Sequence, residues 1–101
     1  MPRIMVIDEG GGVFEEVLSF YRSKRNCRVE VYDNAEKALS TLRASRREYQ
    51  QVVIAFDFKR PNDSFSLRKK VEEINKGLDT QIVYCRGPEK ELRLVGRESL
   101  H

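Results

Sequence analysis

Residues 5–21 read MVIDEGGGVFEEVLSFY and contain the transition that decides the fold. A continuous apolar run ends at two adjacent acids, Asp8 and Glu9, and a glycine turn then leads into a different pattern. Apolar residues after the turn recur at the spacing of one helix face. An apolar strand followed by an amphipathic helix is typical of a parallel sheet that is buried on both faces. The stretch therefore predicts the start of an α/β domain.

The same alternation of strand and helix patterns continues along the chain. Residues 28–32, 51–56 and 81–85 are predicted strands, and the first of them alternates in polarity as an edge strand does. The stripes predicted to form helix faces are Val13, Phe14, Val17, Leu18 and Tyr21, then Ala35, Ala38, Leu39 and Leu42, then Leu67, Val71, Ile74 and Leu78. This order predicts right-handed crossovers in a doubly wound parallel sheet.

Polar residues mark where the predicted helices begin. Asp33 and Glu36 have the spacing of a capping box before the second helix. Ser64 and Ser66 are alternative caps for the third helix.

The C-terminal segment, residues 88–101, has an ambiguous pattern. Leu92 and Val95 suit one face of a short helix, whereas Leu92 and Leu94 suit one face of a strand. We slightly favour the helix, which would leave the sheet without a fifth strand.

Length and composition indicate one domain spanning residues 1–101. The chain is 40% apolar and 35% charged, which is a globular composition, and its length matches a common domain size. Its apolar runs are shorter than the ~20 residues of a membrane span, and its N-terminus lacks a signal-peptide pattern. We therefore expect a cytoplasmic protein without a membrane partner. The net charge of +3 is too mild to predict nucleic-acid binding.

Three acids follow predicted strands and suggest a common site. Asp8 and Glu9 end the first strand, and Asp57 ends the third. Sites in open parallel sheets form at the carboxyl ends of the strands, near the point where the strand order reverses. If those strands are neighbours, the carboxylates converge, and Mg²⁺ is a suitable ion to bind them. The alternative interpretation is that these acids cap helices or remain solvated.

The glycines do not predict a nucleotide site. With Gly10 and Gly12 as the first pair of a dinucleotide fingerprint, the third glycine position is occupied by Glu15. The Gly-Lys-Ser/Thr sequence of a P-loop is absent from the chain. We interpret the glycines as a turn.

Taken together, these motifs resemble the receiver domain of two-component response regulators. The resemblance covers residues 3–87 and comprises VIDEG with Asp8 and Glu9, NAEKAL at the second helix, and DFKRP with Asp57 and Pro61. It implies a flavodoxin-like α/β fold, phosphoryl transfer from a sensor histidine kinase to Asp57, and Mg²⁺ bound by Asp8, Glu9 and Asp57. Metal-assisted attack by a carboxylate is chemically suited to those roles.

The chain also departs from the receiver pattern. Arg86 stands where the family has Ser or Thr, the family's fifth-strand Lys has no counterpart, and a Gly after the Asp-x-x-x-Pro turn is replaced within NDSFS. Arg86 is therefore interpreted in three ways: it binds phosphate in place of the Lys, pairs with Asp57, or faces solvent. The resemblance implies the receiver strand order 2-1-3-4-5, and because a fifth strand with its Lys is not recognised here, we expect the order 2-1-3-4 with strand five missing or replaced.

The leading hypothesis is an atypical receiver that accepts a phosphoryl group at Asp57 and is not itself an enzyme. The alternative is a phosphorylation-independent pseudo-receiver that acts as a protein-interaction module. A phosphatase or phosphotransferase is less favoured, because strand one ends Asp-Glu-Gly rather than Asp-x-Asp. The expected partners are a sensor histidine kinase or another signalling protein. A homodimer through the exposed edge of strand four, or through the C-terminal segment, is also predicted. The alternative is that the tail of the same chain folds back on that edge.

Overall fold

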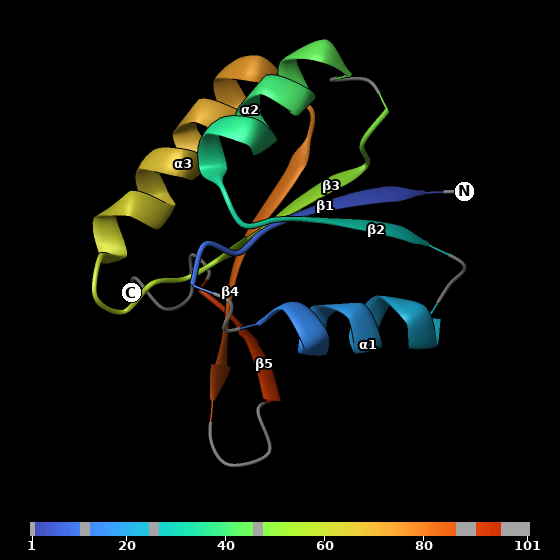
Figure 1. Ribbon diagram of the computed structural model, residues 1–101, viewed down its shortest axis with the longest axis vertical. Helices are drawn as coiled ribbons and strands as arrows, with labels where there is room; N and C mark the ends of the chain where they lie inside the picture. Colours follow the sequence, from blue (N-terminus) through green and yellow to red (C-terminus); the bar gives the residue numbers. More distant parts are fainter. Residues whose placement is uncertain (1, 11–12, 25–26, 46–47, 87–90, 96–101) are drawn as a thin grey trace.

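The computed structural model describes residues 2–10, 13–24, 27–45, 48–86 and 91–95. Its strands and helices alternate along most of the chain (Figure 1). The elements are β1 (Arg3–Ile7), α1 (Phe14–Lys24), β2 (Arg28–Tyr32), α2 (Ala35–Ala44), β3 (Gln51–Ala55), α3 (Pro61–Ile74), β4 (Asp79–Arg86) and β5 (Glu91–Leu94). No described helix has the length and apolar character needed to cross a membrane.

The strands form one mixed sheet in the order β2-β1-β3-β4-β5. The first four strands pair in parallel, which confirms the predicted order 2-1-3-4 and the edge position of β2. Figure 1 shows α2 and α3 on one face of the sheet and α1 on the other. This arrangement is consistent with the predicted doubly wound fold.

The expectation that the sheet lacks a fifth strand is wrong. Residues 91–94 form β5, which pairs antiparallel with β4 and places Leu92 opposite Cys85 and Leu94 opposite Val83. Strand rather than helix forms here because the edge of β4 offers backbone partners that a four-residue segment can use. The same pairing removes the exposed β4 edge that suggested a homodimer. A homodimer through the C-terminal segment stays a prediction.

The continuously apolar strands are buried on both faces of the sheet, as their composition predicted. Side chains alternate along each strand, so Met5 and Ile7 face α2 and α3, while Ile4 and Val6 face α1. The core on the side of α2 and α3 contains Met5, Ile7, Ala38, Leu39, Leu42, Tyr49, Val52, Ile54, Leu67, Val71, Leu78 and Ile82. The core on the side of α1 contains Ile4, Val6, Val13, Val17, Val53 and Val83.

The helices begin at residues other than the predicted caps. Asn34, rather than Asp33, caps α2, because its side chain accepts a hydrogen bond from the N–H of Lys37 at 3.1 Å. Helix α3 begins with Pro61, ahead of both Ser64 and Ser66. Proline suits the first helical position because it has no N–H to leave unpaired. The side chain of Phe14 and glycines 11–12 lie outside the described residues.

Candidate functional site

The carboxyl ends of β1 and β3 open into a pocket of about 550 Å³, here called the acidic pocket. Strands β1 and β3 are neighbours, with Val6 opposite Val53 and Ile7 opposite Ile54, so their ends reach the same edge of the sheet. The acidic pocket is lined by Ile7, Asp8, Glu9, Gly10, Val13, Ile54, Ala55, Phe56, Asp57, Phe58, Lys59, Arg60, Asp63, Ser64 and Leu67. The three predicted acids therefore share one pocket.

Asp8 is buried and helps to fix the start of α1. Its side chain is 3% exposed, and Oδ2 accepts a hydrogen bond from the N–H of Val13 at 3.0 Å. Its own backbone N–H donates to the carbonyl of Tyr32 at 2.9 Å, which extends the junction between β1 and β2. The carboxylate of Asp8 thus caps the backbone N–H of the residue directly before α1. The adjacent Glu9 is exposed at the pocket wall.

Asp57 is exposed and shapes the loop between β3 and α3. Its Oδ1 accepts a hydrogen bond from the N–H of Lys59 at 2.9 Å, and its carbonyl accepts one from the N–H of Arg60 at 3.1 Å. A side chain that accepts from the backbone two residues ahead forms an Asx turn. A carboxylate has about four acceptor positions, so this turn leaves Asp57 with capacity for further partners.

Ser64, which was predicted as a helix cap, instead lies within α3 and connects it to β3. Its Oγ accepts a hydrogen bond from the N–H of Asp57 and donates one to the carbonyl of Ala55, both at 3.4 Å. The residue is buried and lines the acidic pocket. Ser64 therefore fixes the floor beneath the Asp57 loop.

The carboxylates that share the pocket were predicted to bind a metal ion. Among the described residues, no group of three or more His, Cys, Asp or Glu side chains is placed to hold a metal ion. Carboxylate oxygens are the kind of ligand that Mg²⁺ prefers. Mg²⁺ binding by Asp8, Glu9 and Asp57 stays a prediction. So do the roles of Arg86, whose side chain lies outside the described residues.

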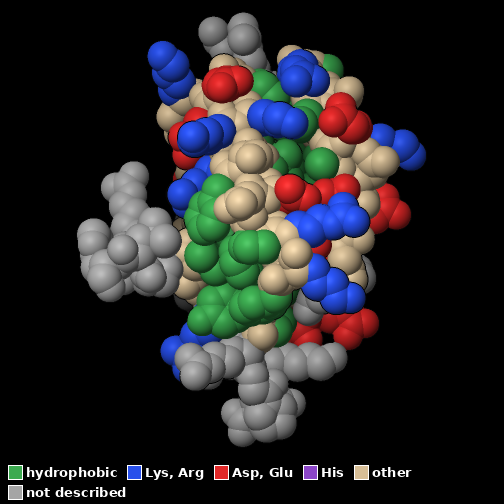
Figure 2. Space-filling model, turned by 90° about the vertical axis from the view of Figure 1, so that its left-hand side faces the viewer, with side chains coloured by type: hydrophobic (Ala, Val, Ile, Leu, Met, Phe, Trp, Pro, Cys, Tyr) green, Lys and Arg blue, Asp and Glu red, His purple; other side chains and the backbone are tan. Residues whose placement is uncertain are grey.

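Two cations and two aromatic side chains also line the acidic pocket. They were not assigned to the site from the sequence. Lys59 and Arg60 line the acidic pocket beside Asp57. Phe56 and Phe58 flank Asp57 and line the same pocket. The sequence FDF was the available signal, because it places an aromatic residue on each side of Asp57. Figure 2 shows hydrophobic side chains gathered on the side of the molecule where α3 begins.

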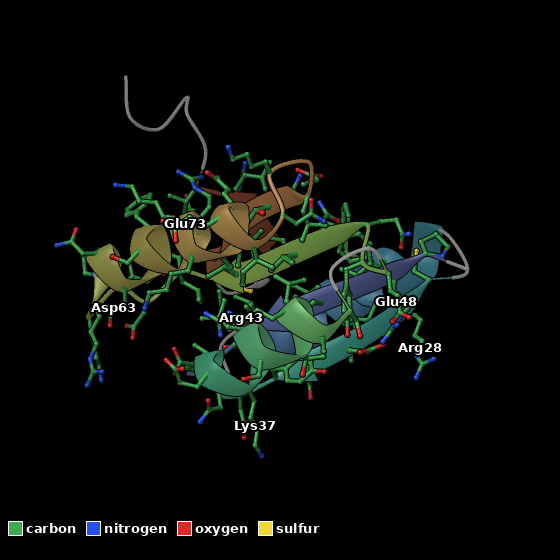
Figure 3. All side chains as sticks on the ribbon, turned by 90° about the horizontal axis from the view of Figure 1, so that it is seen from above. Arg28, Lys37, Arg43, Glu48, Asp63 and Glu73 are labelled. Atoms are coloured by element: carbon green, nitrogen blue, oxygen red, sulfur yellow. The ribbon has the colours of Figure 1, made fainter. Side chains whose placement is uncertain are left out.

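The opposite end of the sheet is closed by a polar network centred on Arg3. Its guanidinium bonds to Glu30 at 2.8 Å, donates to the hydroxyl of Tyr49 at 3.1 Å, and pairs with Glu48. The Tyr49 hydroxyl donates to Glu30 at 2.7 Å. In Figure 3 the labelled Glu48 lies at this end, and Asp63 lies at the end of the acidic pocket.

The network shifts the ionisation of its members. Burial and the hydrogen bond to Glu30 raise the pKa of Tyr49 above its ordinary value. Burial alone would raise the pKa of Glu30, but hydrogen bonds from Tyr49 and Arg3 outweigh it and lower that pKa. We interpret the network as structural, because its groups satisfy one another.

A scan of protein-family models finds no match to the chain, and searches of curated proteins and of solved structures find none either. Function is therefore inferred from the side chains of the acidic pocket. The pocket combines one buried acid, three exposed acids and two cations at the edge where the strand order reverses.

Proposed function

We propose that the protein is a receiver-like signalling domain that accepts a phosphoryl group at Asp57. One observation carries the proposal: the exposed Asp57 and the buried Asp8 line the same pocket, at the boundary between β1 and β3. The strand order reverses at this boundary, which is where open α/β sheets place their ligands.

The chemistry needs an exposed carboxylate and nearby positive charge. An oxygen of Asp57 would attack phosphorus while the bond from phosphorus to the donor breaks, and the donor leaves with that electron pair and takes up a proton. Lys59 and Arg60 line the pocket and are suited to neutralise the phosphoryl oxygens. The expected donor is a phosphorylated histidine of a sensor kinase or another signalling protein.

The proposal includes a bound metal ion, although the attack of Asp57 on phosphorus does not depend on that ion. Asp8, Glu9 and Asp57 are the residues that would hold Mg²⁺, and the ion would reduce repulsion between these carboxylates and phosphate. Titration of Mg²⁺ followed by NMR tests this part separately. Saturable shifts of these residues support the metal site, and shifts elsewhere or none count against it.

Phosphoacceptance is tested by incubating the protein with acetyl phosphate and Mg²⁺ and measuring its intact mass. We expect one phosphoryl adduct that is absent in Asp57→Asn and present in the control Asp63→Asn, because Asp63 is another exposed acid of the same pocket. Failure of the wild-type chain to form an adduct, or an adduct in Asp57→Asn, would overturn the proposal.

A second candidate is a phosphorylation-independent interaction module. It is favoured by the hydrogen bonds that Asp8 and Asp57 already accept from backbone N–H groups, which give both acids a structural use. Under this candidate Asp57→Asn leaves partner binding unchanged and the mass experiment shows no adduct.

A further inference from the structure

Four aromatic rings form a connected cluster beside the acidic pocket, here called the aromatic patch. Phe58 packs edge-on against Phe56 with ring centroids 4.9 Å apart and against Tyr84 at 5.5 Å. Phe56 in turn contacts Phe65 at 6.1 Å. The patch thus joins the β3–α3 loop, α3 and β4 on the side of the molecule viewed in Figure 2.

Phe58 is the exposed member of the aromatic patch and contacts two other rings. Its side chain is 68% exposed, although its partners Phe56 and Tyr84 are partly buried. A single exposed apolar residue needs no explanation, but a contiguous apolar patch at the rim of a pocket commonly marks a contact surface. Edge-to-face packing also holds Phe58 in one place before any partner arrives, which lowers the entropy cost of binding.

The charge of the acidic pocket indicates which kind of group would bind there. Asp8, Glu9, Asp57 and Asp63 line it together with only Lys59 and Arg60, so the formal charge of its described lining is negative. The whole chain carries a net charge of +3, so the pocket has the sign opposite to that of the chain. A basic group is therefore attracted to this pocket more than to the rest of the surface.

We propose that the aromatic patch and the acidic pocket together dock a segment of a partner protein in which an apolar side chain is followed closely by Arg or Lys. The apolar side chain packs on Phe58 and Tyr84, and the cation enters the pocket towards Asp57 and Asp63. Arginine suits the site best, since its guanidinium pairs with carboxylates and stacks on aromatic rings. The inference deepens the proposed function by naming the kind of partner that approaches the same pocket, but it needs no phosphoryl transfer.

A second copy of this chain fits the surface less well than a basic segment does. A two-fold dimer uses the same face of both protomers, so it would bring two pockets of net negative formal charge towards each other. Like charges placed opposite each other oppose association.

A second hollow, with an apolar lining, serves as a control. It lies between α1 and the strands β3, β4 and β5, has a volume of about 470 Å³, and includes Phe20, which is 42% exposed. Its lining contains Arg93 and no acidic residue among the described residues. It therefore offers apolar contact without attraction for a basic group.

The experiment uses the full chain and three synthetic peptides of equal length: one with alternating Leu and Arg, one with Glu in place of Arg, and one with Ser in place of Leu. Binding is followed by NMR amide shifts and by fluorescence anisotropy at two salt concentrations. We expect the Leu/Arg peptide alone to bind strongly, with shifts centred on Phe58 and Tyr84. Its affinity should fall as salt rises.

Variants then separate the apolar and the charged contributions. Phe58→Ser should weaken binding of the Leu/Arg peptide at least about tenfold, as expected for an aromatic anchor at a docking site. Asp63→Asn should weaken binding about two- to fivefold and reduce its salt dependence, as expected for a charge at the rim. Phe20→Ser should change nothing. Thermal unfolding of each variant confirms that it is folded.

Several results would overturn the inference. These are equal binding of the Leu/Glu peptide, shifts centred on the hollow beside α1, no effect of Phe58→Ser, or dimerisation through the patch in light scattering. Phosphoacceptance can fail independently, because peptide binding needs no phosphoryl transfer and is tested with Phe58→Ser and Asp63→Asn, whereas the mass adduct is tested with Asp57→Asn. An adduct without peptide binding would leave the proposed function intact and remove this inference.

Discussion

The buried carboxylate of Asp8 accepts a hydrogen bond from the backbone N–H of Val13 at 3.0 Å. This contact ties the end of β1 to the start of α1 and holds an acid at the base of the pocket that Asp57 lines. The residue is therefore placed to serve the fold and the proposed site together. Its structural contribution can be measured apart from any signalling role.

We expect Asp8→Ala to lower the free energy of unfolding by about 1–2 kcal/mol, because the buried N–H of Val13 loses its acceptor. Asp8→Asn should cost less, since its side-chain oxygen can still accept that bond. Glu9→Gln, at an exposed neighbour, should stay within about 0.5 kcal/mol of wild type. Urea unfolding measures all three, and equal effects of Asp8→Ala and Glu9→Gln would contradict the capping role.

The structural role of Asp57 in its turn can likewise be measured apart from its proposed chemical role. Asn also forms Asx turns, so Asp57→Asn should keep the hydrogen bond from Lys59 and remain within about 0.5 kcal/mol of wild type. Asp57→Ala removes the acceptor and should cost about 0.5–1.5 kcal/mol. The measurements are urea unfolding and hydrogen exchange at the amide of Lys59. Faster exchange in Asp57→Asn than in Asp57→Ala would show that the turn is not held in this way.

Glu30 gives a prediction about pH. Its pKa in the folded protein lies below 4.5, the ordinary value, so the unfolded state takes up a proton first as the pH falls. The stabilisation is fully present well above pH 4.5 and is lost as the pH falls through the folded pKa. Glu30→Gln should therefore lower stability at pH 7 and flatten its decline below pH 5.

Denaturant unfolding at a series of pH values tests that expectation. The control is Glu36→Gln, an exposed acid in the first turn of α2, which should leave the shape of the pH profile unchanged. Parallel profiles for wild type and Glu30→Gln would show that the network of Arg3, Tyr49 and Glu30 contributes nothing to acid unfolding.

The fold was largely predictable because its central strands are continuously apolar. A strand with one buried face needs an apolar residue only at every second position. Runs such as RIMVI and QVVIA are apolar at successive positions, so they predict a sheet covered on both sides. The neighbouring positions of Asp8 and Asp57 followed from the same reasoning, since parallel strands end at one edge.

Features decided by tertiary contacts were not predictable. Leu92 and Leu94 form a pattern too short to distinguish helix from strand, and the available edge of β4 decides between them. The network around Arg3 joins residues far apart in the sequence, and no local pattern marks it. The exposure of Phe58 likewise depends on where α3 begins, and Pro61 was the overlooked signal for that position.

Strand β5 gives the last prediction, because it covers the edge of β4 with only four residues. Leu92 packs against the core on the side of α1, whereas Leu94 is 55% exposed. We expect Leu92→Ser to lower the free energy of unfolding by about 1–3 kcal/mol and Leu94→Ser to change it by less than about 0.5 kcal/mol. Loss of β5 pairing would also expose the unpaired backbone of β4, so Leu92→Ser should self-associate at high concentration in light scattering, and Leu94→Ser should behave as wild type does. If both variants unfold and associate alike, β5 is not held by Leu92, and the antiparallel pairing would need another source of stability.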